Sequence, residues 1–129
     1  MVSQVNPDTV KAMRPFVPAQ DFKKSQAFYR DLGFREEELA PGLSEMYLGP
    51  YSFILQDYFV KDWAGNFVMH VLVDDLDGWW DHFKSLDLAG PYGVEPPRAP
   101  KLESWGLRVA YVFDPSGVLW HFAELPKKR

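Results

Sequence analysis

The sequence predicts an α+β fold of two related βαβββ modules that form an open, curved mixed sheet around a ligand cleft. Three observations support this: two Asp-capped amphipathic segments, strand-like segments around them, and an internal repeat. The 129 residues suffice for one hydrophobic core but not for two separate ones. We therefore expect a single domain over 1–129, with module 1 at about 12–60 and module 2 at about 66–125.

The segment 21–33, DFKKSQAFYRDLG, predicts the first helix. The Asp21 side chain can accept hydrogen bonds from the free amides of the first turn, and Gly33 can adopt the left-handed conformation that ends a helix. The apolar side chains recur at helical spacing and predict one buried stripe: Phe22, Phe28, Tyr29 and Leu32.

A second helix is predicted after Asp75, through the segment 76–87, LDGWWDHFKSLD. Its apolar stripe is wider than that of the first helix and includes Trp79 and Phe83. His82 falls on the opposite side of this helix, so we expect it to be solvated.

Strand-like segments surround both helices and are rich in β-branched and aromatic residues. They are 14–19, 34–38, 44–48, 51–58, 67–73, 107–113 and 118–124. Gly-Pro at 49–50 and DPSG at 114–117 are turn signals that predict antiparallel hairpins. The segment 90–100 contains four prolines, which predicts a loop with at most a short edge strand.

The internal repeat relates VPAQDFKKSQAFYRDLGF to VLVDDLDGWWDHFKSLDL. In each copy a strand leads into an Asp-capped helix. Aligning the last strands of the two modules pairs Gln56 with His121, and the proline-rich segment then accounts for the extra length of the second copy.

Composition excludes several classes of function. The net charge of −4 argues against a nucleic-acid partner, and no apolar run is long enough to predict a membrane span. The N-terminus lacks the pattern of a signal peptide, so we expect a cytoplasmic protein with a small-molecule ligand. The absence of cysteine removes thiolate metal ligands and nucleophiles. The basic run 127–129 is expected to be a solvated tail.

Three stretches resemble the vicinal oxygen chelate superfamily, which includes glyoxalase I, extradiol dioxygenases, fosfomycin-resistance enzymes and bleomycin-resistance proteins. They are PFVPAQDFKKSQAFYRDLGF from Pro15, HVLVDDLDGWW from His70 and WGLRVAYVFDPSGVLWHFAE from Trp105. The resemblance implies that strands of both modules curve around a shared concave face that holds the ligand.

Metal-dependent members of this superfamily take ligands from four positions. The resemblance maps them onto Arg14, Gln56, Val68 and His121. A guanidinium repels a cation and an isopropyl group has no donor atom, so we expect no metal cofactor. The alternative is a divalent-metal-dependent lyase, isomerase or dioxygenase of glyoxalase type that uses Gln56, His70 and His121. Against it, His70 lies roughly 6 to 7 Å further along the strand than Val68.

The metal-free pattern is most similar to bleomycin-resistance proteins, which sequester a bulky cationic glycopeptide in the clefts of a homodimer without chemistry. The resemblance therefore implies a homodimeric binding protein for a bulky aromatic or cationic ligand, with no catalytic residues. The candidate ligand-binding residues are Arg14, Gln56, Tyr58, Trp63, Phe67, His70, Trp105 and His121. Trp120 is expected in the core. Arg14 needs an anionic partner, for which Glu38, Glu45, Asp57 and Glu103 are candidates, or else an anionic ligand.

Overall fold

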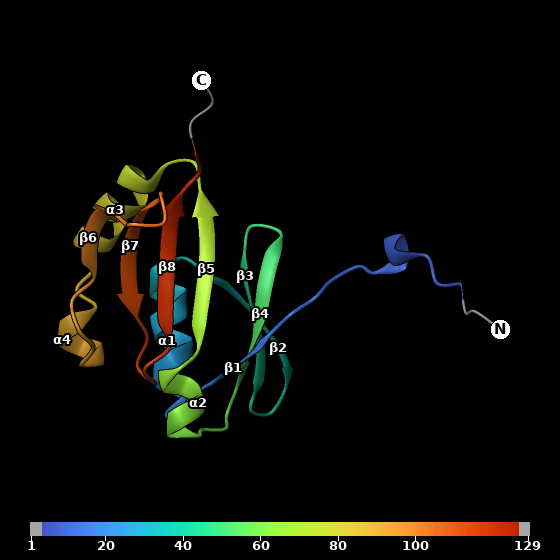
Figure 1. Cartoon of the computed structure of the whole chain (residues 1–129). Helices are drawn as coiled ribbons and strands as arrows, with labels where there is room; N and C mark the ends of the chain where they lie inside the picture. The colour runs from blue at the N-terminus through green and yellow to red at the C-terminus, as the bar shows by residue number, and fades with distance from the viewer. Residues whose placement is uncertain (1–3, 127–129) are drawn as a thin grey trace.

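The computed structural model describes residues 4–126 and contains two four-stranded mixed sheets with the same topology (Figure 1). The strands are β1 (Phe16–Pro18), β2 (Arg35–Ala40), β3 (Leu43–Leu48), β4 (Tyr51–Gln56), β5 (Val68–Val73), β6 (Arg98–Leu102), β7 (Arg108–Phe113) and β8 (Leu119–Glu124). The strand orders are β1-β4-β3-β2 and β5-β8-β7-β6. In each sheet the first strand runs parallel to the last, and the other neighbours are antiparallel. The two predicted βαβββ modules are confirmed.

The two long helices begin at the predicted aspartates. The Asp21 side chain accepts a hydrogen bond from the amide of Lys24 at the start of α1 (Phe22–Leu32), and Asp75 does the same for Gly78 at the start of α3 (Leu76–Ser85). Gly33 ends α1 with a φ of 123°, a conformation that favours glycine. The predicted caps are therefore confirmed, although α3 ends two residues before the predicted end.

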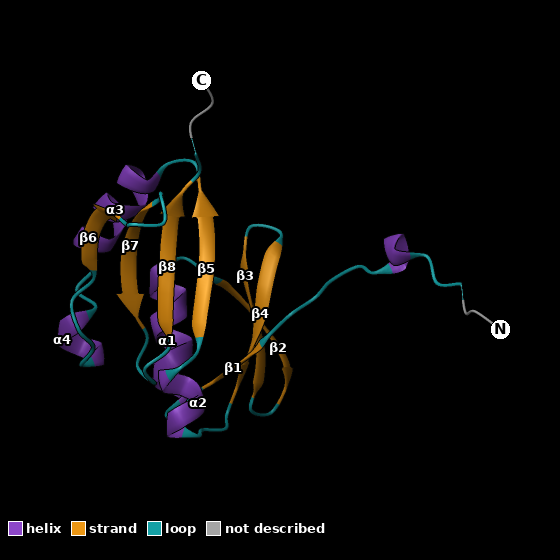
Figure 2. Ribbon diagram, viewed as in Figure 1, coloured by secondary structure: helices purple, strands orange, loops and turns teal. Residues whose placement is uncertain are grey.

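α1 contacts β2 and β4 of the first sheet, and α3 contacts β6, β7 and β8 of the second. In the view of Figure 2, α1 lies behind β8 of the second sheet. The two modules nevertheless share one core, because Tyr29 of α1 packs against both Phe53 of β4 and Trp120 of β8. The ring centroids of these pairs are 4.9 Å and 5.6 Å apart. Trp120 is buried, as predicted.

Two local expectations were wrong. The predicted loop at 90–100 begins with the end of a short helix, α4 (Ala89–Tyr92), although the expected edge strand is present as β6. The connector between the modules also contains a short helix, α2 (Lys61–Gly65), which the sequence did not predict. A helix of one turn is too short to leave a periodic pattern of apolar residues. His82 is half-buried rather than solvated, because its Nε2 lies 2.9 Å from the carbonyl oxygen of Leu32 at the end of α1.

Residues 4–13 form an extended arm that leaves the body of the molecule and contains a single 3-10 turn, η1 (Pro7–Thr9) (Figure 1). Among residues 4–126, none of the helices is long and apolar enough to cross a membrane. The basic run 127–129 lies outside the described residues.

Candidate functional site

The site is organised around β5, an edge strand whose side chains alternate between two environments. Val68, His70 and Leu72 are exposed on one face, whereas the residues between them face the core. The sheet register places His70 beside His121 of β8, and His121 beside Tyr111 of β7. The pairing of strands thus brings three aromatic side chains into one row across the open face of the second sheet.

Trp105 completes this row from the loop before β7. It is 52% exposed, and its ring lies nearly parallel to that of His121, with centroids 6.3 Å apart and an interplanar angle of 25°. Tyr111 meets His121 edge-on at 5.0 Å. The loop is held by hydrogen bonds between Glu103 and both Leu107 and Gly106. We call His70, Trp105, Tyr111 and His121 the aromatic face.

Burial and one nearby carboxylate set the electrostatics of the aromatic face. Burial, followed by the neighbouring His70, lowers the pKa of His121, whereas Glu103 opposes this shift. Burial and hydrogen bonding to Glu103 raise the pKa of Tyr111. The His121 ring, which the lowered pKa keeps neutral at neutral pH, and the Tyr111 phenol therefore lie near the carboxyl group of Glu103. This combination suits a flat ligand that carries a positive charge.

Arg14 lies beside the first sheet and forms an ion pair with Glu45 of β3. Its Nε is 2.5 Å from a carboxylate oxygen of Glu45 and 3.1 Å from the hydroxyl of Ser52, which itself donates to Glu45 at 2.7 Å. Glu45 is 4% exposed. Burial raises its pKa, but hydrogen bonds from Ser52 and Tyr47 and the charge of Arg14 outweigh burial and leave it below its usual value. One of the expected partners of Arg14, Glu45, is thus confirmed.

A second aromatic cluster lies on and around α2, in the connector between the modules. Trp63 is 6.3 Å from Tyr58 and 6.1 Å from Phe67, measured between ring centroids. Gln56 ends β4, where it pairs with Pro18 of β1. The eight candidate residues therefore divide among the first sheet (Arg14 and Gln56), the connector (Tyr58, Trp63 and Phe67) and the aromatic face (His70, Trp105 and His121).

The donor atoms do not fit a resident divalent ion. Two of the four positions that the resemblance assigns to metal ligands are Arg14, whose guanidinium is a cation, and Val68, which supplies no donor. Within residues 4–126, no group of three or more His, Asp or Glu side chains comes together that could hold a metal ion.

The register also changes the expected pairing of Gln56 with His121. Phe16 and His70 each lie five residues before their capping aspartate, and so occupy equivalent positions in the two modules. Phe16 pairs with Ile54, whereas His70 pairs with His121. The residue of the first module that corresponds to His121 is thus Ile54 by this criterion.

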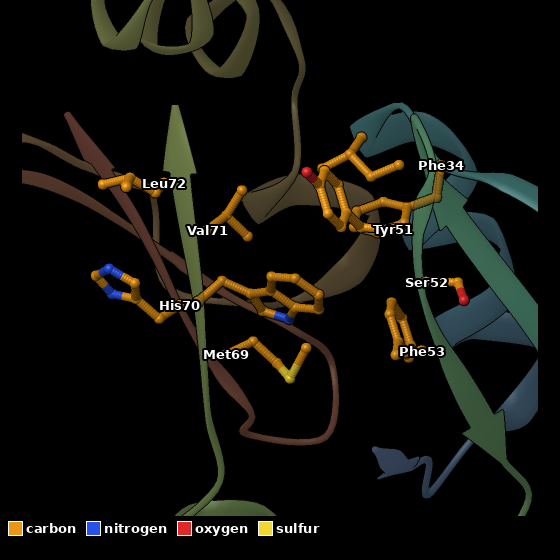
Figure 3. Close-up of a pocket in the computed structure, with 10 residues that line it drawn as sticks. Phe34, Tyr51, Ser52, Phe53, Met69, His70, Val71 and Leu72 are labelled. Atoms are coloured by element: carbon orange, nitrogen blue, oxygen red, sulfur yellow. The ribbon is translucent and has the colours of Figure 1, made fainter. Parts of the chain in front are cut away.

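A cavity of about 410 Å³ between β4 and β5, which we call the inter-sheet slot, was not anticipated from the sequence (Figure 3). Its lining is mostly apolar: Phe34, Leu48, Tyr51, Ser52, Phe53, Met69, His70, Val71, Leu72 and Trp120. Most of these residues look like core in the sequence, because apolar side chains in strands give the same pattern whether they are covered or line a cavity.

Comparison with known proteins agrees with this architecture. Residues 11–122 match the sequence model of the Glyoxalase/Bleomycin resistance protein/Dioxygenase superfamily. The chain belongs to this superfamily. The resemblance inferred from the three sequence stretches is therefore confirmed, and the aromatic face and the inter-sheet slot are features of a superfamily member.

Solved structures with this fold include ligand-binding members of the superfamily. A bleomycin-binding protein in complex with bleomycin is 25% identical with a TM-score of 0.77, over 91% of this chain and 100% of the other. A bleomycin-binding protein from Streptomyces verticillus is 18% identical with a TM-score of 0.74, over 98% and 100%. Lactoylglutathione lyase from Agrobacterium tumefaciens is 21% identical with a TM-score of 0.64, over 89% and 94%. The last two show the fold alone. No curated protein sequence matches this chain.

Proposed function

We propose that this chain is a metal-free binding protein that sequesters a bulky aromatic or cationic small molecule, as a cytoplasmic homodimer with the ligand in a cleft between subunits. The observation that carries the proposal is the aromatic face with Glu103 beside it. Stacking on Trp105 and His121 would hold a planar ring system, and the carboxylate would favour a positive charge. The bleomycin-binding protein at 25% identity supports the same class of ligand.

Two features support the homodimer. Val68 and Leu72 of β5 are 49% and 48% exposed on an edge strand, an arrangement that proteins usually cover. The N-terminal arm exposes Val5, Val10 and Met13 away from the body (Figure 1). Apolar surface of this kind is typical of contacts between subunits. Sedimentation equilibrium of the full chain tests this part of the proposal, and a monomer at micromolar concentration would contradict it.

The ligand is tested by calorimetric titration with metal-free bleomycin. We expect saturable binding that Trp105→Ala weakens at least tenfold, because the variant loses the exposed ring that stacks beside His121. Trp80→Ala is the matched control, since Trp80 lies on α3, on the other side of the second sheet. Binding that both variants weaken equally would assign the effect to folding and not to the aromatic face.

The role of metal is tested separately. We expect elemental analysis of the purified protein to find no stoichiometric divalent ion, and we expect added nickel, manganese or iron to leave the melting temperature of the ligand-free protein unchanged. A tightly held ion that is lost in both His70→Ala and His121→Ala would contradict the proposal and support the alternative of a metal-dependent lyase or dioxygenase.

A further inference from the structure

The inter-sheet slot exists because β1 covers only part of β4. β1 pairs with Ile54, Leu55 and Gln56, so the first half of β4 has no strand on that side. β5 is the terminal strand of the second sheet, and its outer edge has no strand partner in residues 4–126. These two bare edges form the walls of the slot (Figure 3).

The floor of the slot is aromatic and presents no free donor. Phe34, Phe53 and Trp120 pack against one another with ring centroids 5.3 to 5.4 Å apart. The indole N–H of Trp120 is already used, because it donates to the hydroxyl of Tyr29 at 3.0 Å within the core. A flat apolar group would therefore meet ring surface at this floor.

The walls are apolar and carry no charged side chain among the lining residues. Met69 and Val71 reach from β5 toward β4, whereas the ring of His70 points to the other side of the strand (Figure 3). The Ser52 hydroxyl accepts from Arg14 and donates to Glu45, so its hydrogen-bonding capacity is largely occupied. Because burying an unpaired charge is costly, the slot favours an uncharged group.

The edge of β5 supplies hydrogen-bonding groups nonetheless. The carbonyls of Phe67 and Val73 accept from Leu119 and Leu125, at the two ends of the ladder with β8. In a parallel ladder alternate residues face the partner strand, so the backbone N–H and C=O groups of His70 and Leu72 face away from β8. Both residues line the slot.

We propose that the inter-sheet slot binds an uncharged, flat apolar group of a small molecule, with a polar substituent hydrogen-bonded to the backbone of His70 and Leu72. The inference rests on the proposed function and extends it, because these two residues separate the slot from the aromatic face. One ligand can then place an apolar part in the slot and its cationic part on the face. The volume of about 410 Å³ lies within the range of small-molecule pockets.

The test uses N-phenyl-1-naphthylamine, an uncharged probe whose fluorescence rises in apolar sites. We expect saturable binding with one probe per chain. Val71→Phe and Met69→Phe, which fill the slot, should each weaken binding at least tenfold. Leu102→Phe is the matched control, since Leu102 is exposed on β6, at the opposite edge of the same sheet, and should change affinity less than twofold. The anionic analogue anilinonaphthalene sulfonate should bind at least tenfold more weakly than the uncharged probe.

A second measurement requires no variant. In protein labelled at its methionine methyl groups, we expect nuclear Overhauser effects between the probe and Met69, and none to Met13 of the exposed arm. The affinity of a variant is compared with that of the wild type only if its melting temperature shows that it is folded. If neither filling variant folds, the Overhauser effects with the wild type decide the question.

Several results would overturn the inference. The inference fails if the folded wild type does not bind the probe, or if the filling variants bind it as tightly as the wild type. It also fails if Leu102→Phe loses as much affinity as the filling variants, or if the Overhauser contacts omit Met69. Probe affinity that falls as protein concentration rises would show that a second copy covers the slot. Bleomycin binding is measured on the same samples. If the probe binds the slot and bleomycin does not bind, the proposed function fails and the slot assignment remains.

Discussion

The hydroxyl of Tyr29 donates a hydrogen bond of 2.6 Å to the carboxylate of Asp114, joining α1 of the first module to the turn between β7 and β8 of the second. The same hydroxyl accepts the indole N–H of Trp120. All three side chains are buried, and the other oxygen of Asp114 accepts from the backbone amides of Ser116 and Val118. The two modules are therefore joined by a polar network inside their shared core.

Tyr29→Phe should destabilise the protein. The variant leaves the Trp120 N–H without an acceptor and removes one donor from a buried carboxylate, so we expect a loss of about 2 to 3 kcal/mol in the free energy of unfolding. Urea unfolding monitored by fluorescence measures it. Tyr51→Phe is the control, because Tyr51 is 77% exposed and the change should stay within about 0.5 kcal/mol.

Asp114 should give stability a specific pH dependence. Burial raises its pKa to about 6, despite hydrogen bonds from Tyr29 and the backbone that lower it. Because the native-state pKa of Asp114 lies above its ordinary value of 3.8, the folded protein binds this proton more tightly than the unfolded chain does. The contribution of Asp114 therefore favours folding most below pH 4 and declines as pH rises to about 6. Asp114→Asn should lose this decline in unfolding experiments between pH 4 and 7, and an unchanged profile would contradict the assignment.

The Arg14 and Glu45 pair should show a measurable coupling. In a double-mutant cycle of Arg14→Ala and Glu45→Gln, we expect a coupling free energy of about 1 kcal/mol, because Glu45 is buried and Arg14 only partly exposed. The exposed pair Arg98 and Glu95 is the control and should give a value near zero. Since the pKa of Glu45 is lowered in the fold, its contribution is present above about pH 4.5 and is lost as pH falls further.

Ser25→Ala should stabilise the protein. The Ser25 hydroxyl is buried in α1 and has no hydrogen-bond partner in the described structure. Removing it relieves an unsatisfied polar group and improves helix propensity, so we expect a gain of about 1 kcal/mol in thermal or urea unfolding. Ser85→Ala at the end of α3 is the control: its exposed hydroxyl bonds to the His82 carbonyl, and the variant should gain nothing. A loss of stability in Ser25→Ala would show that the hydroxyl has a partner, such as a buried water.

The sequence by itself determined the two modules and the elements that build them. Asp21 and Asp75 could be recognised as caps because a carboxylate satisfies the same free amides wherever a helix begins. The turn signals between β3 and β4 and between β7 and β8 likewise act locally. Trp120 could be placed in the core because it alternates with His121 along one strand.

Only the tertiary structure decided which of these side chains meet. The candidate aromatic residues proved to form two clusters, since the short helix α2 gathers Trp63 and its neighbours while strand register aligns His70 with His121. The inter-sheet slot depends on how far β1 extends along β4 and on how the two sheets face each other. These are contacts between segments distant in the chain, and local residue patterns carry no information about them.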